Sequence, residues 1–328
     1  MTKKRKRTSV ASFVSQLDPT SPRKHNLSAY HPDLDFSTFS PSSLALYTSL
    51  LPHCLVHPSS FPPKLLKYWY QRYTLFTLYA AGCLLDAESW FSVTPESVAF
   101  RIAKRCACDG TVVDLFAGAG GNAIQLAMTC GKVIAVEMDE TRLKLARWNA
   151  SVYGVEERIA FVRGDSLELM KTLRRWREKG GEEEGQEEVW NGLKASELKA
   201  VEAVFLSPPW GGVDYAQSSQ REHLGTSKAR EGEYDLSSVQ PIHGADLFHQ
   251  VHKAFNTSNI AYYLPRNTSL QQLSDLTTSL DPPQPPVRIE YQYVNHGTKL
   301  SSLTAYYGAL AAEWDDELDD WRKTPTTA

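Results

Sequence analysis

The chain has 328 residues, of which 42% are hydrophobic and 22% charged, a composition typical of a globular protein with one large domain or two modest ones. No apolar run reaches the length of a membrane span, and no signal-peptide core follows the basic start, so we expect no membrane partner. Five cysteines without a regular pattern argue against a disulfide framework and favour a reducing compartment. Because Cys106 and Cys108 have no second pair at zinc-finger spacing, and His249 and His252 fit an ordinary helix, we predict no metal site.

Both ends of the chain are predicted to be tails. Residues 1–40 are rich in Ser, Pro and charge, and we expect them to be largely disordered. Although the net charge is −3, the cluster from Lys3 to Arg7 is strongly basic and resembles a nuclear localisation signal. A solvated phosphate-binding tail is the alternative, and either fits a nuclear RNA-related protein.

Residues 41–92 are predicted to form a helical subdomain, in which 64–79 interleave aromatic and basic residues as one amphipathic helix. Residues 313–328 form the C-terminal tail.

From residue 94 onward, helical and strand patterns alternate, which predicts an α/β domain with a largely parallel sheet and a late antiparallel strand pair. The predicted strands are 111–116, 133–136, 159–162, 203–206, 260–264, 287–294 and 303–307. The predicted helices are 95–106, 122–129, 139–154, 245–255 and 269–280. Two segments are predicted loops, an acidic low-complexity insertion at 178–190 and a polar stretch at 216–240.

A glycine-rich turn follows the first predicted strand. Gly118, Gly120 and Ala123 satisfy the loose dinucleotide fingerprint, so a nicotinamide cofactor has to be considered. Asp114, at the end of that strand, favours a different ligand. Its carboxylate would repel a pyrophosphate, but it suits the cationic amino-acid part of a sulfonium cofactor.

Two further acids follow the next two strands. Glu137 can accept both hydroxyls of a ribose, and Asp165 can accept an adenine amino group. Each acid alone could be a helix cap or a surface charge. With Asp114, however, they occupy three successive strand ends, on the edge where open α/β sheets bind ligands. The sequence therefore predicts S-adenosylmethionine rather than a nicotinamide cofactor.

The stretch from Ser207 to Gly212 follows the strand 203–206, which two prolines end abruptly. Ser207 and the Pro208 carbonyl can accept the N–H groups of a base amine, and Trp210 can stack on its ring. An exocyclic amine is a poor nucleophile because its lone pair is delocalised, and such hydrogen bonds aim that lone pair at a methyl group. The alternative is a rigid loop around a core tryptophan.

Over about residues 64–310 the chain resembles the trimethylguanosine synthase family of RNA cap guanine-N2 methyltransferases. The resemblance rests on these motifs: Lys67-Tyr68-Trp69 with Gln71-Arg72-Tyr73 and Leu75-Phe76; Trp90-Phe91-Ser92-Val93-Thr94-Pro95-Glu96; Val113-Asp114 through Gly121-Asn122; Leu145-Ala146-Arg147 with Asn149-Ala150; Val152-Tyr153-Gly154; Phe205 to Gly212 with Asp214-Tyr215; Tyr263-Leu264-Pro265-Arg266-Asn267; and Thr304-Ala305-Tyr306.

The resemblance implies a Rossmann-like class I methyltransferase domain over residues 93–312, with a seven-stranded mostly parallel sheet after a small helical extension. It implies transfer of methyl groups from S-adenosylmethionine to N2 of a 7-methylguanosine cap, giving 2,2,7-trimethylguanosine. The expected substrates are small nuclear and nucleolar RNAs. The expected location is the nucleus, including the nucleolus, with small ribonucleoprotein proteins as candidate partners.

The resemblance also implies a role for each matching residue. Trp210 would stack on the 7-methylguanine, whose positive charge strengthens the contact, and Ser207 would lie at the reacting amine. The residues expected on the cap phosphates and the rest of the substrate are Lys67, Tyr215, Arg266 and Asn267. Those expected around the cofactor, beside the three acids, are Phe76, Thr94, Gly118, Gly120 and Asn122. Glu137 departs from the Asp that is more usual in the family.

Two other functions stay open at this point. The chain could methylate base amines inside RNA, in which case an uncapped transcript would serve as well as a cap dinucleotide. It could also be a cap-binding RNA-assembly protein without catalysis, which would bind S-adenosylmethionine and transfer no methyl group. A nicotinamide dehydrogenase is the least favoured, because no proton-relay His or Lys follows the fingerprint.

Overall fold

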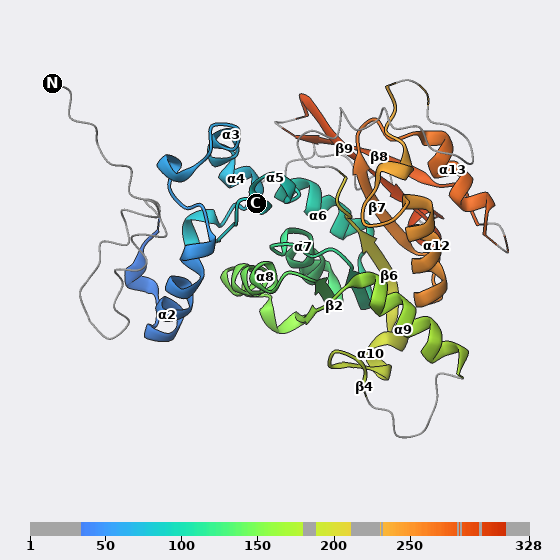
Figure 1. The fold of residues 1–328 in the computed structure, drawn as a ribbon, viewed down its shortest axis with the longest axis horizontal. Coiled ribbons are helices and arrows are strands. Elements are labelled where there is room, and N and C mark those ends of the chain that lie inside the picture. Colours follow the sequence, from blue (N-terminus) through green and yellow to red (C-terminus); the bar gives the residue numbers. More distant parts are fainter. Residues whose placement is uncertain are drawn as a thin grey trace, which may run out of the picture. The chain divides into compact units, whose positions relative to one another are not determined.

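The computed structural model describes residues 34–179, 188–210, 230, 232–280, 282, 284–294 and 297–312 (Figure 1). The chain divides into two compact units: Met1–Lys104 with Phe116–Glu168, and Arg105–Leu115 with Leu169–Ala328. The main sheet has seven strands in the order β3-β2-β1-β6-β7-β9-β8. The predicted α/β architecture is therefore confirmed. The predicted domain boundaries stay a prediction.

The helices and strands occupy the following positions. The helices are α2 Pro41–Leu50, α3 Leu66–Trp69, α4 Arg72–Leu75, α5 Ser89–Ser92, α6 Glu96–Arg105, α7 Gly121–Thr129, α8 Glu140–Val152, α9 Ser166–Glu178, α10 Ala195–Lys199, α12 Gly244–Phe255, α13 Leu270–Thr278 and α14 Ala309–Ala312. The strands are β1 Cys108–Asp114, β2 Cys130–Glu137, β3 Ile159–Arg163, β4 Glu188–Trp190, β5 Leu193–Lys194, β6 Val201–Leu206, β7 Ile260–Pro265, β8 Arg288–Val294 and β9 Lys299–Tyr306. Short 3₁₀ turns stand at Phe36–Thr38, Leu51–His53, Pro58–Ser60, Tyr79–Ala81, Glu156–Arg158 and Leu236–Ser238.

As predicted, the sheet consists of parallel strands followed by a late antiparallel pair. In the first unit β2 and β3 pair in parallel. In the second unit β1 pairs in parallel with β6, and β6 in parallel with β7. The late strands differ, because β9 runs antiparallel to both β7 and β8. The predicted antiparallel pair is thus confirmed.

The predicted single helix over residues 64–79 is wrong. The structure has two four-residue helices, α3 and α4, and Phe76 after them is extended, with φ −139° and ψ 114°. The cause is aromatic packing that a continuous helix could not satisfy. The Trp69 ring lies 6.1 Å from that of Trp90 and 5.9 Å from that of Tyr79. Tertiary contacts therefore override the local helical periodicity.

The N-terminal helices share a core with α8 inside the first unit. The Tyr47 ring of α2 lies 5.6 Å from the Trp148 ring of α8. The Trp148 indole N–H donates to the Gly82 carbonyl at 2.7 Å, and the Trp90 indole N–H donates to the Leu55 carbonyl at 3.0 Å. Both buried indoles thus have hydrogen-bond partners, as burial of a polar group requires.

In the second unit α12 and α13 pack against the strands drawn in orange and red in Figure 1. The Phe248 ring of α12 lies 4.5 Å from that of Tyr307, whose hydroxyl donates to the Leu273 carbonyl of α13 at 3.1 Å. A buried polar cluster joins β8 to β9, because the Tyr306 hydroxyl donates to Glu290 at 2.7 Å. Burial and the Glu290 charge raise the pKa of Tyr306, so its phenol stays a neutral donor.

The two predicted loops lie partly outside the described residues. For the acidic insertion this applies to residues 180–187; α9 continues to Glu178, and Glu188–Trp190 forms β4, which pairs with β5. For the polar stretch it applies to 216–229 and 231. The basic cluster near the N-terminus and the C-terminal tail lie outside as well. Among the described residues, no helix combines the length and apolarity needed to cross a membrane.

Candidate active site

The glycine turn after β1 has the backbone needed to approach a ligand closely. Gly118 has φ +52° and Gly120 has φ +91°, a region that other residues adopt only with strain. A Cβ on Gly120 would stand 3.1 Å from Ala146, so that side of the turn is packed. A Cβ on Gly118 would meet no atom within 4 Å, so space is open beside it. The turn therefore has one packed side and one side able to receive a ligand.

Glu137, at the end of β2, is fixed by the same turn. Its carboxylate accepts the Gly118 N–H and the Asp139 N–H, each at 2.9 Å. The Arg142 guanidinium lies 3.6 Å away and also pairs with Glu88 at 2.6 Å. Burial lowers the pKa of Arg142, but the charges of Glu137 and Glu88 outweigh it, so the pKa is raised and Arg142 stays charged. Each Glu137 oxygen still has a lone pair for a ribose hydroxyl.

Asp165 follows β3, the neighbour of β2. The strand register pairs Glu137 with Arg163, so the two acids stand at adjacent strand ends of the first unit. One Asp165 oxygen accepts the Leu167 N–H at 2.8 Å, in the first turn of α9. The helix-cap interpretation of Asp165 therefore holds for that oxygen. The carboxylate has a second oxygen with which it can accept a ligand amine.

Thr94 and Asn122 meet directly. The Asn122 amide N–H donates to the Thr94 hydroxyl at 2.9 Å, and both side chains are buried. The Asn122 amide oxygen is buried too and has no hydrogen-bond partner. Such an acceptor is costly unless a ligand supplies a donor, so it fits a site that is completed by a bound molecule.

Phe76 is buried, with its ring 6.0 Å from that of Tyr153, and the residue after it is tied down by Glu96. The Glu96 carboxylate accepts both the N–H and the hydroxyl of Thr77, the latter at 2.8 Å. It also accepts the Tyr153 hydroxyl at 2.6 Å. Burial, and then the bond to Glu96, raise the pKa of Tyr153, so its phenol remains a donor. Glu96 thus fixes the segment that carries Phe76.

Sequence reasoning placed Glu96 only in the motif from Trp90 and at the start of the helix predicted over residues 95–106. Its partners Thr77 and Tyr153 are 19 and 57 residues away along the chain. The motif from Trp90 to Glu96 contains the residue, but nothing in its spacing indicates those partners. Asn149 was likewise quoted only as part of a motif. Its buried amide donates to the carbonyls of Leu84 and Ala119, at 3.0 and 2.9 Å.

In the second unit two more predicted residues stand at adjacent strand ends. Asp114 ends β1 and is fully buried, in register with Phe205 of β6. Ser207 and the buried Pro208 come directly after β6, and the Leu115 N–H donates to the Phe205 carbonyl at 3.3 Å. The pairing of β1 with β6 thus brings the first acid beside the Ser-Pro-Pro-Trp loop.

The loop itself is anchored through its backbone. The Pro209 carbonyl accepts the Gln240 N–H at 3.0 Å, and the Trp210 carbonyl accepts the Tyr234 hydroxyl at 3.3 Å. The Trp210 ring is half-buried and tilted by 59° against the buried Tyr263 ring at 5.1 Å. The predicted acceptors for a base amine are Ser207 and the Pro208 carbonyl, next to this anchored residue. Trp210 is therefore a fixed platform with part of its surface accessible.

The predicted phosphate-binding residues belong to different units. Lys67 is exposed in the first unit, with its amine 4.9 Å from the Tyr68 ring centre. Arg266 is exposed after β7 and donates to the Leu300 carbonyl at 3.2 Å. Its neighbour Asn267 donates to the Gly232 carbonyl at 2.9 Å, and the Asn267 amide oxygen is buried without a partner. Tyr215 lies outside the described residues.

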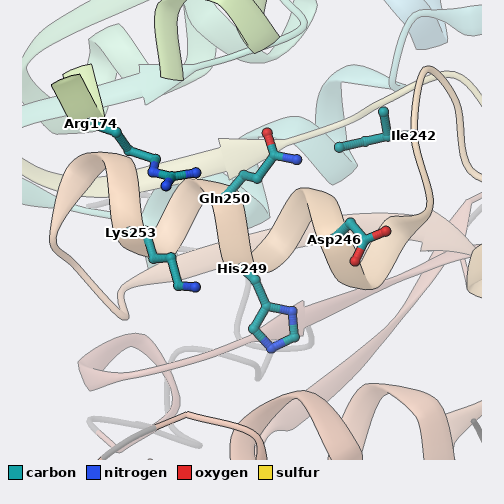
Figure 2. Close-up of a pocket in the computed structure, with 6 residues that line it drawn as sticks. All are labelled: Arg174, Ile242, Asp246, His249, Gln250 and Lys253. Atoms are coloured by element: carbon teal, nitrogen blue, oxygen red, sulfur yellow. The ribbon is translucent and has the colours of Figure 1, made fainter. Parts of the chain in front are cut away.

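A separate pocket of about 390 Å³ lies in the second unit between α9 and α12 (Figure 2). It is lined by Arg174, Ile242, Asp246, His249, Gln250 and Lys253, none of which was predicted to carry chemistry. His249 turns to the opposite side of α12 from Gln250 and bonds to the Ser279 hydroxyl at 2.7 Å. The lining thus combines cationic, acidic and amide side chains, and its histidine is already hydrogen-bonded. Within the described part of the chain, no group of three metal-ligating side chains occurs.

A seven-stranded α/β sheet with a glycine turn after its first strand, acids at strand ends and a Ser-Pro-Pro-Trp loop defines a class I methyltransferase. A family model for the RNA cap guanine-N2 methyltransferases matches residues 109–310, and the chain belongs to this family. It is an enzyme that uses S-adenosylmethionine to methylate the guanine N2 of capped RNA. The predicted family, activity and methyl donor are thus confirmed, and the alternative functions are not favoured.

Two curated relatives are trimethylguanosine synthases. The protein from Schizosaccharomyces pombe is 33% identical over 229 residues, covering 69% of this chain and 80% of its own length. The one from Saccharomyces cerevisiae is 32% identical over 220 residues. The matched region covers 65% of this chain and 58% of that protein. Among solved structures, a putative methyltransferase from Porphyromonas gingivalis aligns with a TM-score of 0.50 at 14% identity, covering 82% of this chain and 59% of that one. That likeness supports the fold.

Proposed function

We propose that this enzyme adds two methyl groups to N2 of a 7-methylguanosine cap, giving 2,2,7-trimethylguanosine. The observation that carries the proposal is the anchored Trp210, held half-exposed on Tyr263 three residues after the strand-end Ser207. The similarity to two trimethylguanosine synthases, at 32% and 33% identity, supports the same product.

The three acids are the proposed contacts of the methyl donor. Bound S-adenosylmethionine supplies a methyl group on a positively charged sulfur, which leaves as a neutral thioether when an amine attacks. Asp114 is proposed to bind the amino group of the donor, and its complete burial would make a charged pairing strong. Glu137 is proposed to accept the ribose hydroxyls, and Asp165 the adenine amine. The fixed orientation of Glu137 against the glycine turn supports its assignment.

The remaining cofactor contacts are proposed around the same turn. Gly118 and Gly120 would allow the close approach of the backbone, and Asn122 would offer its unpaired amide oxygen. Thr94, already bonded to Asn122, and Phe76, fixed through its neighbour Thr77, would close over the donor.

On the acceptor side, Trp210 is proposed to stack on 7-methylguanine. Its positive charge adds a cation–π attraction of about 0.5 to 2 kcal/mol, which unmethylated guanine lacks. Ser207 and the Pro208 carbonyl are proposed to accept the N2 hydrogens, so that the nitrogen lone pair points at the methyl carbon. The new N–C bond forms as the C–S bond breaks, and the amine proton then leaves to solvent.

The cap phosphates are proposed to bind to Lys67, Arg266 and Tyr215, from separate parts of the chain. Lys67 and Arg266 are exposed and charged, which supports this assignment. Asn267 has a buried amide oxygen without a partner, and it is proposed to contact the substrate beside Arg266. Tyr215, outside the described residues, is proposed to join them.

Mass spectrometry of 7-methylguanosine diphosphate after incubation with enzyme and S-adenosylmethionine tests the proposal. We expect a product with one added methyl group, followed by a product with two. Guanosine diphosphate, which lacks the positive charge, serves as the matched control and should gain far less. If 7-methylguanosine diphosphate gains no methyl group, the proposed function is wrong; if the product stops at one, the proposed endpoint is wrong.

We also propose that the enzyme acts in the nucleus, including the nucleolus, on small nuclear and nucleolar RNAs delivered by ribonucleoprotein proteins. The basic cluster from Lys3 to Arg7 supports nuclear import. A fluorescent fusion with these five residues replaced by alanine should lose nuclear enrichment. Unchanged enrichment would remove the cluster from this role.

A further inference from the structure

The first unit contains one long segment without acidic residues. The whole chain carries 38 acidic and 35 basic residues, yet residues 36–85 contain no Asp or Glu. Within that segment Lys64 and Lys67 are exposed, and Arg72 is half-buried. In an enzyme of net charge −3 that acts on a polyanion, this segment contributes cations and no carboxylate of its own that would repel a phosphate backbone.

The same surface presents two tyrosines to solvent. Tyr70 is 72% exposed and Tyr73 is 43% exposed. The Arg72 guanidinium lies 4.5 Å from the Trp69 ring centre and 4.6 Å from the Tyr73 ring centre, so it lies against both rings. It also donates to the Trp69 carbonyl at 3.0 Å. Arg72 thus couples the exposed Tyr73 to the buried Trp69 and orients it.

Ring packing accounts for the position of the Tyr73 side chain only in part, and it does not account for that of Tyr70. Tyr73 makes an edge contact with Tyr79 at 6.3 Å, while Tyr70 makes no ring contact among the described residues. Exposed aromatic rings beside cations, with no nearby acid in the sequence, are the surface that single-stranded nucleic acids bind. Their bases stack on the rings, and their phosphates meet the cations. The chemistry therefore matches RNA better than an apolar protein partner.

We propose that Tyr70 and Tyr73 form a stacking platform for the unpaired bases that follow the cap, with Lys64 on the intervening phosphates. The position of the platform relative to the cap rests on the proposed function, in which Lys67, three residues before Tyr70, holds the cap phosphates. The platform makes the enzyme prefer a capped RNA over an isolated cap through contacts that carry no base sequence.

The test compares two substrates in one methylation assay: a cap dinucleotide, and a capped unstructured RNA of about ten nucleotides, enough for a short stacking track. Tyr70→Ala and Tyr73→Ala should each raise KM for the capped RNA about tenfold, the typical loss for one stacked base. KM for the dinucleotide should stay within about twofold. Tyr70→Phe and Tyr73→Phe keep the ring and should restore the wild-type KM, because stacking does not need the hydroxyl. Tyr291→Ala, which removes a 40% exposed ring on β8 of the second unit, is the matched control and should change neither KM.

Binding of uncapped single-stranded RNA, measured by fluorescence anisotropy, separates this proposal from the proposed function. Loss of that binding in the two alanine variants supports the platform even if the enzyme fails to methylate the cap dinucleotide. Equal affinity and equal KM across all variants would overturn the platform and leave the surface to a protein partner. An equal rise in KM for both substrates would also overturn it, since the tyrosines would then act on the cap itself.

Discussion

Asn149 provides the sharpest test of how the first unit shapes its glycine turn. Its side chain is fully buried on α8 and makes three hydrogen bonds. The amide oxygen accepts the Leu84 N–H at 2.8 Å, and the amide group donates to the carbonyls of Leu84 and Ala119 at 3.0 and 2.9 Å. One side chain thus joins α8 both to the segment before α5 and to the turn between Gly118 and Gly120.

Asn149→Ala removes all three bonds and leaves three backbone groups without their partner. At about 1 to 1.5 kcal/mol for each bond, we expect a loss of about 3 to 5 kcal/mol in the free energy of unfolding of this unit. For a unit of this size, that corresponds to a fall in Tm of about 10 °C. Asn149→Asp should be at least as damaging, because a carboxylate cannot donate and would face two carbonyl oxygens.

Thermal unfolding followed by circular dichroism measures the effect, with and without S-adenosylmethionine. Ser151→Ala is the matched control on the same helix, because its hydroxyl bonds only to the local Trp148 carbonyl at 2.7 Å. We expect that variant to shift Tm by about 1 °C or less. A loss below about 1 kcal/mol for Asn149→Ala would refute the reasoning, since it would mean that the three bonds contribute no net stability.

Three further variants test the two halves of the site. Trp210→Ala should lower kcat/KM for the cap about 100-fold through lost stacking while leaving cofactor affinity nearly intact in calorimetry; retained activity would remove the stacking role. Asp114→Ala should weaken binding of S-adenosylmethionine about 10- to 100-fold by removing a charged hydrogen bond, and unchanged affinity would exclude it from the site. Tyr153→Phe removes the 2.6 Å bond to Glu96 and loosens the segment carrying Phe76, so KM for S-adenosylmethionine should rise about tenfold. If instead KM for the cap rises and that for the cofactor does not, Glu96 positions something other than Phe76.

The sheet could be predicted because its signals are local. Each buried strand is a short apolar run, and Asp114, Glu137 and Ser207 are recognisable from their place directly at or after such a run. The division of residues 64–79 into two short helices could not be predicted, because Trp69 packs against Trp90, which lies well beyond the periodic segment. Periodicity reports which residues are apolar, but it does not report which distant ring they contact.

The positioning residues were missed for the same physical reason. Asn149 bonds to residues 65 and 30 positions away, and Tyr153 bonds to Glu96 57 positions away. A polar residue inside a helix is usually solvated, so a single sequence offers no signal that its amide is buried and fully bonded. Residues that contact a ligand can be predicted from the chemistry of their motifs. The residues that hold them in place follow only from the tertiary structure.

The rigid-loop and functional interpretations of Trp210 concern the same contacts. Gln240 and Tyr234 hold the carbonyls of Pro209 and Trp210, while Tyr263 supports the indole. Immobilising a free side chain on binding costs about 0.5 to 1.5 kcal/mol, comparable to what a cation–π contact contributes. A mobile indole would therefore bind either base more weakly, by an amount comparable to the cation–π contribution. The contacts that a purely structural loop would make are thus the ones that let Trp210 bind a charged base without this cost.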